Sequence, residues 1–572
     1  MGGSQGFDSD APMAVPRDSY SRREALRWAG GAAAAAALGP ALLASGCAST
    51  ASKAAGEVDV AIIGGGPSGL YAAYRLLTGT PGPGSPVARG SGKGGRPSVA
   101  VFEATGRLGG RIWSVVPPGA PHLVAEFGGM RFLQTQEIVP RLVSALKLPY
   151  VPFSHGSGQN LVYLRGVRFG ERQYADPAVV PYPLPADEAG KTPAQLMLRG
   201  IRTYIPRAAT MTSAEWEQAK KTASYNGQLL ADQGFWNLMQ RALSPEGFDL
   251  VADGIGYPTL FENWNAAEQM QALAGDFAPG AAYFTTRGGY QRLPLTLGTM
   301  ARQAGAAIHL QHPVVGVEPS PGGEVSLTVQ SPGGASTRVT ARHVIMAIPS
   351  DPLARIVERS PFLQDAKLTA AMATVGTSPA SKMFLAFDKP WWSALGIAGG
   401  SSITDLPIKR CWYFGTEGQQ PGANPASKHS LLMCYNDLSP AGYWNGYEPA
   451  PAFTGPPAPR ASPRPLVASA VEQLSELHGM KVPDPYWSGF IDWQNLPYGN
   501  GFHCWLVHAR SWEVIPYLRR PFDGIGLSIC GDCWSPAQNW IESGLTTTEG
   551  LLQSTFGYRP PPWLPEGMGI ST

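Results

Sequence analysis

The hydrophobic pattern becomes regular near residue 59. Asp59–Ile63 is a short apolar run of the kind that forms a strand buried on both faces. It leads into Gly64–Gly69, after which Leu70–Leu77 carries apolar residues at helical spacing. A second run, Ser98–Phe102, predicts another strand. The residues between helix and second strand, 78–96, are mostly Gly, Pro, Ser and Thr and predict an inserted loop.

The glycines between the first strand and the helix have the spacing GxGxxG. Gly64 permits a tight turn, Gly66 lets the backbone approach a pyrophosphate, and Gly69 lets helix and strand pack closely. The N-terminus of the helix offers free N–H groups and a partial positive charge to phosphates. Glu103, at the end of the second strand, can accept hydrogen bonds from ribose hydroxyls. The segment therefore predicts a dinucleotide site.

The middle of the chain has a different periodicity. Phe235, Leu238, Met239 and Leu243 share one face of a helix, and we expect a helical insert over 186–276.

Composition narrows the possible classes of protein. The chain has 572 residues, which suggests two or three structural units. A net charge of +2 without a basic stripe gives no support for nucleic-acid binding. The 69 Gly and 54 Pro argue against a long helical bundle or coiled coil, and stretches at 319–336, 417–426 and 447–465 predict hairpin loops and surface excursions.

Residues 1–47 have the layout of an export signal. A polar stretch containing Arg22 and Arg23 is followed by a weakly apolar run, Trp28–Ser45, and by Cys47. This resembles a twin-arginine signal with a lipoprotein cleavage box. It implies either a cell-envelope lipoprotein tethered to the membrane through lipidated Cys47, or a freely secreted chain if the box is not used.

The cysteines predict no metal site. Six cysteines are too few for a disulfide scaffold. Cys530 and Cys533 have the spacing of half a zinc site, but no second pair of ligands stands near them in the sequence.

Five ordered segments resemble the flavin amine oxidases. They are Glu103–Arg111, Glu126–Phe132, Arg287–Pro294, His312–Val317, and Cys530–Asp532 with Trp540–Leu545. The second is similar to the "GMR" segment of L-amino acid oxidases and of their relatives, the decarboxylating amino-acid 2-monooxygenases. The resemblance implies FAD as cofactor and an α/β fold, with a Rossmann-type, glutathione-reductase-like FAD domain, an interleaved α+β substrate domain and the helical insert.

The resemblance also implies roles for site residues. Arg131 would form a fork to the substrate carboxylate, for which a guanidinium is well suited. Lys382 would hold a water near flavin N5, and Trp540 would wall the site beside the flavin ring.

A tyrosine hydroxyl of the family helps to hold the same carboxylate. Either Tyr413 or Trp412 would face the pocket, because neighbouring strand residues point to opposite faces. Phe502 would line the side-chain pocket together with Trp264 and Trp505, which favours bulky apolar or aromatic substrates. His503 would be structural or exposed at the rim.

Residues expected to contact FAD follow from the same segments. They are Gly64, Gly66, Pro67, Ser68, Gly69, Glu103, Ala104, Gly110, Arg111, Gly128, Gly129, Met130, Arg131, Val314, Gly531, Asp532, Trp540 and Ile541.

The domains implied by the resemblance are interleaved along the chain. The FAD-binding domain would comprise 57–150, 280–348 and 500–558, and the substrate domain 151–185 and 349–499.

The activity implied is oxidation of an L-amino acid, by hydride transfer from Cα to flavin N5, to the 2-oxo acid, ammonia and hydrogen peroxide. The substrates would be two small molecules, an L-amino acid and O₂, and the expected assembly is a homodimer. The alternatives are a decarboxylating 2-monooxygenase that forms an amide, an amine oxidase or dehydrogenase, and an FAD-binding lipoprotein without activity.

Overall fold

The computed structural model describes residues 56–88, 90–153, 159–278, 280–447, 460–494 and 500–565. The expected export signal, Cys47 included, lies outside these ranges. None of the described helices is both long and apolar enough to cross a membrane.

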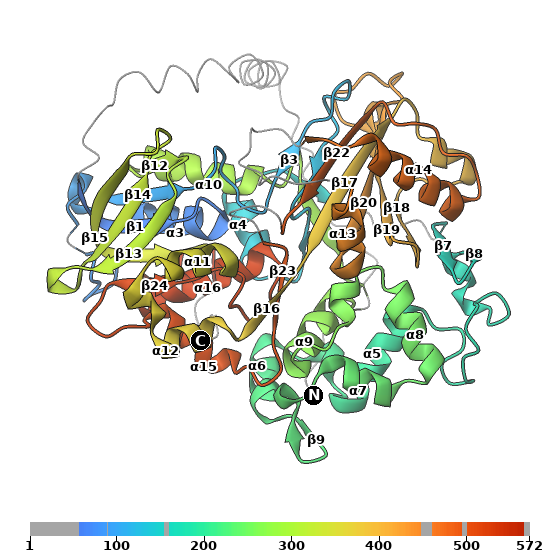
Figure 1. The fold of residues 1–572 in the computed structure, drawn as a ribbon, viewed down its shortest axis with the longest axis horizontal. Helices are drawn as coiled ribbons and strands as arrows, with labels where there is room; N and C mark the ends of the chain where they lie inside the picture. Colours follow the sequence, from blue (N-terminus) through green and yellow to red (C-terminus); the bar gives the residue numbers. More distant parts are fainter. Residues whose placement is uncertain are drawn as a thin grey trace, which may run out of the picture. The chain divides into compact units, whose positions relative to one another are not determined.

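The two predicted apolar strands lie at the centre of a seven-stranded sheet (Figure 1). The order is β12–β2–β1–β15–β14–β13, and β24 pairs with β15. Strands β12, β2, β1, β15 and β24 are parallel to one another. Strand β14 is antiparallel to both of its neighbours, β13 and β15. The bounds are β1 Glu57–Ile63, β2 Val99–Glu103, β12 Ala307–Leu310, β13 Val314–Pro319, β14 Val325–Gln330, β15 Ser336–Met346 and β24 Leu527–Ile529. This is the Rossmann-type sheet that the sequence predicts, with a strand, β14, inside the stretch 319–336 that we expected to be loop.

Three helices cover one side of this sheet. They are α3 Pro67–Thr78, α10 Arg292–Gln303 and α16 Ile541–Ser554, and their apolar side chains form one buried cluster with those of β1 and β2. Close packing of α3 on β1 requires Gly69, because a Cβ at this position would lie 2.0 Å from the carbonyl oxygen of Gly64. The loop after α3 lies where predicted, between Thr78 and Val99.

The other side of the sheet is covered from later in the chain. Helices α11 Ser350–Glu358, α12 Ala366–Met372 and α15 Ser511–Arg519 bury Leu353, Leu368 and Ile515 in one apolar cluster with Val317 of β13. We assigned 349–499 to the substrate domain, but the structure places α11 and α12 on the first sheet. The amphipathic pattern of these helices does not reveal which sheet their apolar face covers.

A second sheet has eight strands in the order β21–β22–β17–β20–β19–β18–β7–β8 (right-hand side of Figure 1). Helices α13 Leu438–Asn445 and α14 Arg464–His478 pack on one of its faces. The other face carries Phe384, Trp412 and Met433 toward a separate cluster around Phe127. The strand bounds are β7 Leu161–Leu164, β8 Val167–Gly170, β17 Ala380–Phe387, β18 Gly400–Thr404, β19 Arg410–Thr416, β20 Ser430–Asp437, β21 Arg460–Ala461 and β22 Trp487–Asp492.

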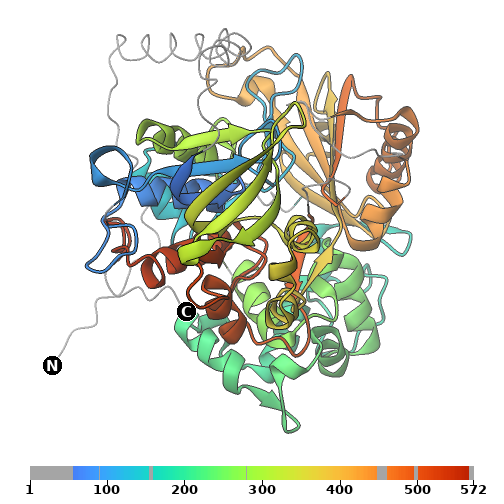
Figure 2. The same cartoon turned by 60° about the vertical axis from the view of Figure 1, so that its left-hand side comes forward.

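The helical segment follows β8 in the chain (green in Figure 2). It comprises α5 Pro193–Tyr204, α6 Ser213–Thr222, α7 Phe235–Ala242, α8 Pro245–Gly254 and α9 Ala266–Asp276, with a hairpin of β9 Ser224–Tyr225 and β10 Gln228–Leu229. The four apolar positions used to predict a helix are buried at α7 and just after it.

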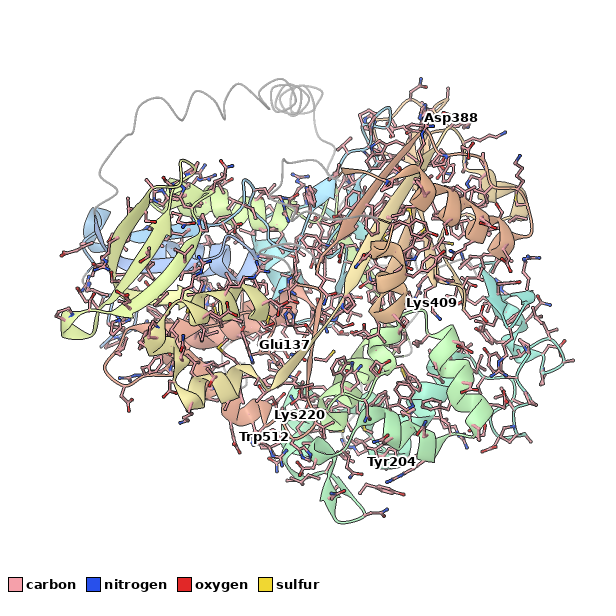
Figure 3. All side chains as sticks on the ribbon, viewed as in Figure 1. Glu137, Tyr204, Lys220, Asp388, Lys409 and Trp512 are labelled. Carbon is pink, nitrogen blue, oxygen red and sulfur yellow. The ribbon has the colours of Figure 1, made fainter. Side chains whose placement is uncertain are left out.

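Buried charges fix the helical segment to α15. Lys220 on α6 donates to Glu268 on α9 at 3.0 Å, and Ser511 of α15 donates to the same carboxylate. Trp512 packs against the apolar cluster of the helical segment close to Lys220 (Figure 3).

Short pairings join the parts. Strands β5 Phe132–Leu133 and β6 Tyr150–Pro152 flank β11 Tyr283–Thr286, and β3 Ser114–Val115 pairs with β4 Ala125–Glu126. Strand β16 Val375–Ser378 pairs with β23 Phe502–Trp505. Helix α4 Val139–Ala145 starts at the Glu542 carboxylate, which accepts from three backbone N–H groups at its N-terminus. These pairings bring residues of the first sheet, the second sheet and the helical segment around one cavity.

Candidate active site

A cavity of about 840 Å³ is lined by all three parts of the fold. The first sheet contributes the glycine turn after β1 and the end of β2, the second sheet contributes Lys382 and Tyr435, and the helical segment contributes Trp264 and Asp276. Every residue expected to contact FAD lines this cavity except Gly69, whose place is in the packing of α3 on β1.

The glycine turn leaves backbone groups open to the cavity. Gly64 has φ +108°, a conformation that L side chains rarely adopt. Gly66 is the N-cap of α3, and no side chain among the described residues caps this helix. A Cβ on Gly66 would meet no protein atom closer than Gly110 Cα at 3.8 Å, so the space next to it is free. Free N–H groups at a helix N-terminus suit a phosphate.

Glu103 fixes the loops around it. Its carboxylate accepts from Gly65 N at 2.7 Å, from Thr105 N at 2.8 Å and from the Thr105 hydroxyl at 2.6 Å. The side chain is buried and lines the cavity, and a carboxylate has lone pairs for further donors such as ribose hydroxyls.

Arg111 and Asp532 form an ion pair on the cavity wall. Burial acts to raise the pKa of Asp532, but the charge of Arg111 and the neighbouring His503 outweigh it and hold this pKa well below its usual range. Arg111 also contacts His503 Nδ1 at 3.2 Å, and His503 Nε2 lies 3.0 Å from Cys533 Sγ. His503 is fully buried and does not lie at a rim.

His503, Asp532 and Cys533 have ligand atoms within 4.8 Å of one another, close enough for a metal ion. The Arg111 guanidinium points into the same cluster and repels a cation, and a zinc site needs about four ligands. We therefore assign this cluster to positioning of the cavity wall.

Lys382 lies on β17 with its amine buried beside the "GMR" segment. Its Nζ donates to the carbonyl oxygens of Glu126, at 3.1 Å, and Gly128. Burial lowers the pKa of Lys382 to about 7, with Arg131 adding to the effect and Glu126 opposing it. Burial likewise raises the pKa of the Glu126 carboxyl to about 7. The cavity therefore holds an amine that changes protonation near neutral pH.

Replacing Lys382 with Met should remove a step near pH 7 from the pH profile of kcat/KM. In the unsubstituted protein we expect activity to rise as pH passes through about 7, because the amine is charged below this value and neutral above it. A charged lysine opposes the positive charge that develops on a substrate amine as it is oxidised. A second step, from the substrate amine itself, should persist in both proteins and serves as the internal control. An unchanged profile would assign the first step to another group.

Arg131 lines the cavity and also a smaller one beside it. Its guanidinium packs 4.3 Å from the ring centre of Tyr283, 5.0 Å from that of Trp412 and 5.4 Å from that of Phe153. The Asp276 carboxyl is near enough for Arg131 to lower its pKa, but burial outweighs this and raises the pKa to about 7. The aromatic rings hold the guanidinium plane in position.

The strand register places Trp412, not Tyr413, toward Arg131. Trp412 is packed in the cluster around Phe127, whereas Tyr413 points to the opposite face of β19 and does not line the cavity. The Tyr413 hydroxyl contacts Ser402 Oγ at 2.7 Å and His478 Nε2 at 2.6 Å. The tyrosine contact to the carboxylate that the resemblance implies is therefore not made by Tyr413.

Tyr413→Phe should lower stability without changing substrate binding. Loss of the hydroxyl removes two buried hydrogen bonds, and we expect the free energy of unfolding to fall by about 1–3 kcal/mol. KM should stay within about twofold, since the side chain does not reach the cavity. Urea unfolding and steady-state kinetics of the same preparation test both statements, and a strongly raised KM would return Tyr413 to the site.

Phe502 and Trp540 line the cavity as expected, together with Trp264 and Trp505. Trp540 stacks on Tyr283 with ring centres 6.3 Å apart and precedes α16, whose first residue Ile541 also faces the cavity.

Sequence reasoning missed Asp276, Tyr257, Tyr435 and Arg410, which lie around Arg131. No local motif marks these four, but Arg410 stands two positions before Trp412 and must share its face of the strand.

The cavity fits FAD. It offers an uncapped helix N-terminus beside a glycine turn, a carboxylate at the end of the second parallel strand, and a long wall formed by the "GMR" segment and the residues after β24. Each is a feature that a dinucleotide cofactor requires.

Comparison with known proteins agrees with this geometry. The family model described as flavin containing amine oxidoreductase matches residues 67–537. The chain belongs to this family. It is therefore an FAD-dependent amine oxidoreductase.

Relatives of this amine oxidoreductase include aplysianin-A of Aplysia kurodai, which is 26% identical over 87% of this chain and 90% of its own length. The L-amino-acid oxidase of Naja atra is 27% identical over 66% of each chain. Among solved structures, cyclohexylamine oxidase from Brevibacterium oxydans covers 87% of this chain and 100% of its own, with a TM-score of 0.63 and 18% identity. Putrescine oxidase bound to putrescine covers 88% of this chain and 98% of its own, with a TM-score of 0.62 and 18% identity. The solved structures share the fold.

Proposed function

We propose that the protein is an L-amino acid oxidase. The observation that supports this most directly is Arg131, a guanidinium that is held by three aromatic rings and lines the cofactor cavity. A planar fork of N–H donors matches a carboxylate and has no partner in a simple amine. The similarity to L-amino-acid oxidases points in the same direction.

The chain's own residues then have distinct tasks. When bound, FAD supplies the acceptor for the two electrons removed from the substrate's Cα–N bond. Arg131 binds and orients the carboxylate, and the rings of Tyr283 and Trp412 keep water from its faces. Lys382, fixed by two carbonyl oxygens, can hold a water or a proton beside the reacting carbon. The imine product hydrolyses to a 2-oxo acid and ammonia, and O₂ is reduced to hydrogen peroxide.

The test is an anaerobic mixing experiment with the purified holoprotein. L-amino acids and their decarboxylated amines are added separately while flavin absorbance is followed. Bleaching by amino acids but not by amines is expected. Bleaching by amines alone would mean that Arg131 does not bind a substrate carboxylate. After admission of air, formation of peroxide and 2-oxo acid supports the oxidase, whereas an amide would reveal a 2-monooxygenase.

The side-chain preference we propose is bulky and apolar or aromatic, because Trp264, Phe502 and Trp505 all line the cavity. Phenylalanine and leucine should give the highest kcat/KM in a panel of L-amino acids. A panel in which lysine or glutamate is clearly best would contradict this preference.

We also propose export by the twin-arginine route, with a membrane tether through lipidated Cys47 or release as a secreted protein. The basis is the arginine pair and apolar run within residues 1–47. Mass spectrometry of the membrane fraction should find a diacylglycerol-linked N-terminus at Cys47, and Cys47→Ala should release the protein from it. An unprocessed cytoplasmic chain would contradict export.

The homodimer remains a proposal from the family resemblance alone. Light scattering of the purified protein should give a mass near twice that of one 60.7 kDa chain.

A further inference from the structure

A second cavity, of about 270 Å³, adjoins the first at Arg131. Arg131, Tyr257, Leu260 and Asp276 line both cavities, so the two communicate at this point. The second cavity has one further charged side chain in its wall, Arg410 of β19.

Arg410 belongs to the same face of the sheet as Lys382. Lys382 on β17 is opposite Tyr435 on β20, and Tyr435 is opposite Arg410 on β19. Directly opposed residues of antiparallel strands project to the same side. The side chains make contact along this row, since Lys382 Nζ lies 5.2 Å from the ring centre of Tyr435, whose ring packs on Tyr257. Arg410 therefore faces the substrate side of the sheet.

The Arg410 guanidinium is buried, and no carboxylate among the residues that the structure describes forms an ion pair with it. It is 9% exposed, its Nε donates to Ser401 Oγ at 3.0 Å, and it packs 4.6 Å from the ring centres of both Tyr257 and Trp412. Its two other nitrogens have no hydrogen-bond acceptor within the described ranges. Glu171 acts on it only at longer range, from an exposed position. A buried cation of this kind requires an anion.

Arg131 and Arg410 pack against the same ring of Trp412 and repel each other. Asp276 is the only carboxylate in the wall of the second cavity as described. Because burial raises the pKa of Asp276 to about 7, this carboxylate balances at most one of the two guanidinium charges, and at least one positive charge stays unmatched. An amino acid that carries a neutral, oxidisable amine is an anion, so its α-carboxylate can match this remaining charge.

We propose that Arg410 is a second anchor for the substrate's α-carboxylate, which lies between Arg410 and Arg131. This inference rests on the proposed amino acid oxidase function. Arg410 takes the place of the tyrosine hydroxyl that Tyr413 cannot supply, because Tyr413 projects from the opposite face of β19. Two guanidinium groups around one carboxylate select against simple amines more strongly than one does.

The test compares binding of benzoate and benzamide to the FAD-loaded protein by calorimetry. The two probes have similar shape and differ in charge. Arg410→Gln should raise the Kd of benzoate by about 10- to 100-fold, as expected for a lost charge-assisted contact, and change that of benzamide by less than about twofold. Arg338→Gln is the matched control, since Arg338 is exposed, pairs with Glu318 and lines neither cavity.

Each other outcome is decisive. Unchanged benzoate binding in Arg410→Gln, or equal weakening of both probes, would overturn the proposal and leave Arg410 as a support for Trp412. If Arg410→Gln lost activity only toward glutamate and aspartate, the proposal would be overturned, because Arg410 would then bind the substrate's side-chain carboxylate. Arg410→Lys, which keeps the charge, should recover much of the benzoate affinity, whereas a folding defect would not be selective for the charged probe.

The proposed function is tested separately by Arg131→Gln. If this variant loses benzoate affinity while Arg410→Gln does not, the second anchor fails and the oxidase proposal stands. If the unsubstituted protein shows no preference for benzoate over benzamide, both fail.

Discussion

Arg131→Ala is expected to lower kcat/KM for L-amino acids by about 30-fold to several thousand-fold. Removing one partner of a buried charge pair costs about 2–5 kcal/mol, because the substrate carboxylate is then desolvated without a matching donor. The cofactor should remain bound, since the glycine turn, Glu103 and Asp532 lie elsewhere along the cavity.

The measurement is steady-state kinetics with an L-amino acid and with its decarboxylated amine. The ratio of the two kcat/KM values should collapse toward one in the variant, because only the amino acid uses Arg131. Arg131→Lys keeps the charge but loses the paired donors, so its ratio should lie between those of Arg131→Ala and the unsubstituted protein. An unchanged ratio, with FAD retained, would remove Arg131 from substrate recognition.

Gly66→Ala and Gly69→Ala should both weaken FAD binding, but for different reasons. At Gly66 the new methyl group meets no protein atom within 3.4 Å, so the chain should fold normally. It would occupy space at the helix N-terminus that a pyrophosphate requires, and such overpacking costs about 1–3 kcal/mol, or about 5- to 150-fold in affinity. At Gly69 the methyl group would lie 2.0 Å from the Gly64 carbonyl oxygen, so helix α3 itself must move.

Thermal unfolding of the cofactor-free proteins separates the two effects. Gly66→Ala should keep the melting temperature of the unsubstituted apoprotein and lose only the increase that FAD produces. Gly69→Ala should melt lower even without FAD. If the two variants behave alike in the apo form, the open space beside Gly66 is not reserved for the cofactor.

The cofactor half of the site is largely readable from the sequence. The glycine turn, Glu103 and the adjoining strand and helix lie within short stretches, where local periodicity and glycine spacing determine the conformation. The segments that resemble flavin amine oxidases all line the cavity, because each is an ordered stretch whose residues act together. The helical insert was predictable for the same reason, since its apolar spacing is local.

The substrate half depended on features that no short stretch contains. Whether Trp412 or Tyr413 packs toward Arg131 is decided by the register of β19 against β20, and a shift of one residue would exchange them. Helices α11 and α12 could have covered either sheet. Strand β14 has the alternating apolar residues of a strand, but the Gly and Pro residues on both sides of it led us to expect a loop.

By itself the sequence determined that this protein has a dinucleotide site built on parallel strands, and that one arginine of a recognisable segment stands near it. Only the tertiary structure decided which charges surround that arginine. Lys382, Tyr435 and Arg410 come from three strands and meet only through cross-strand pairing, while Asp276 arrives from the helical segment. The physical reason is that backbone conformation follows local side-chain patterns, whereas burial and charge balance depend on residues brought together from distant parts of the chain.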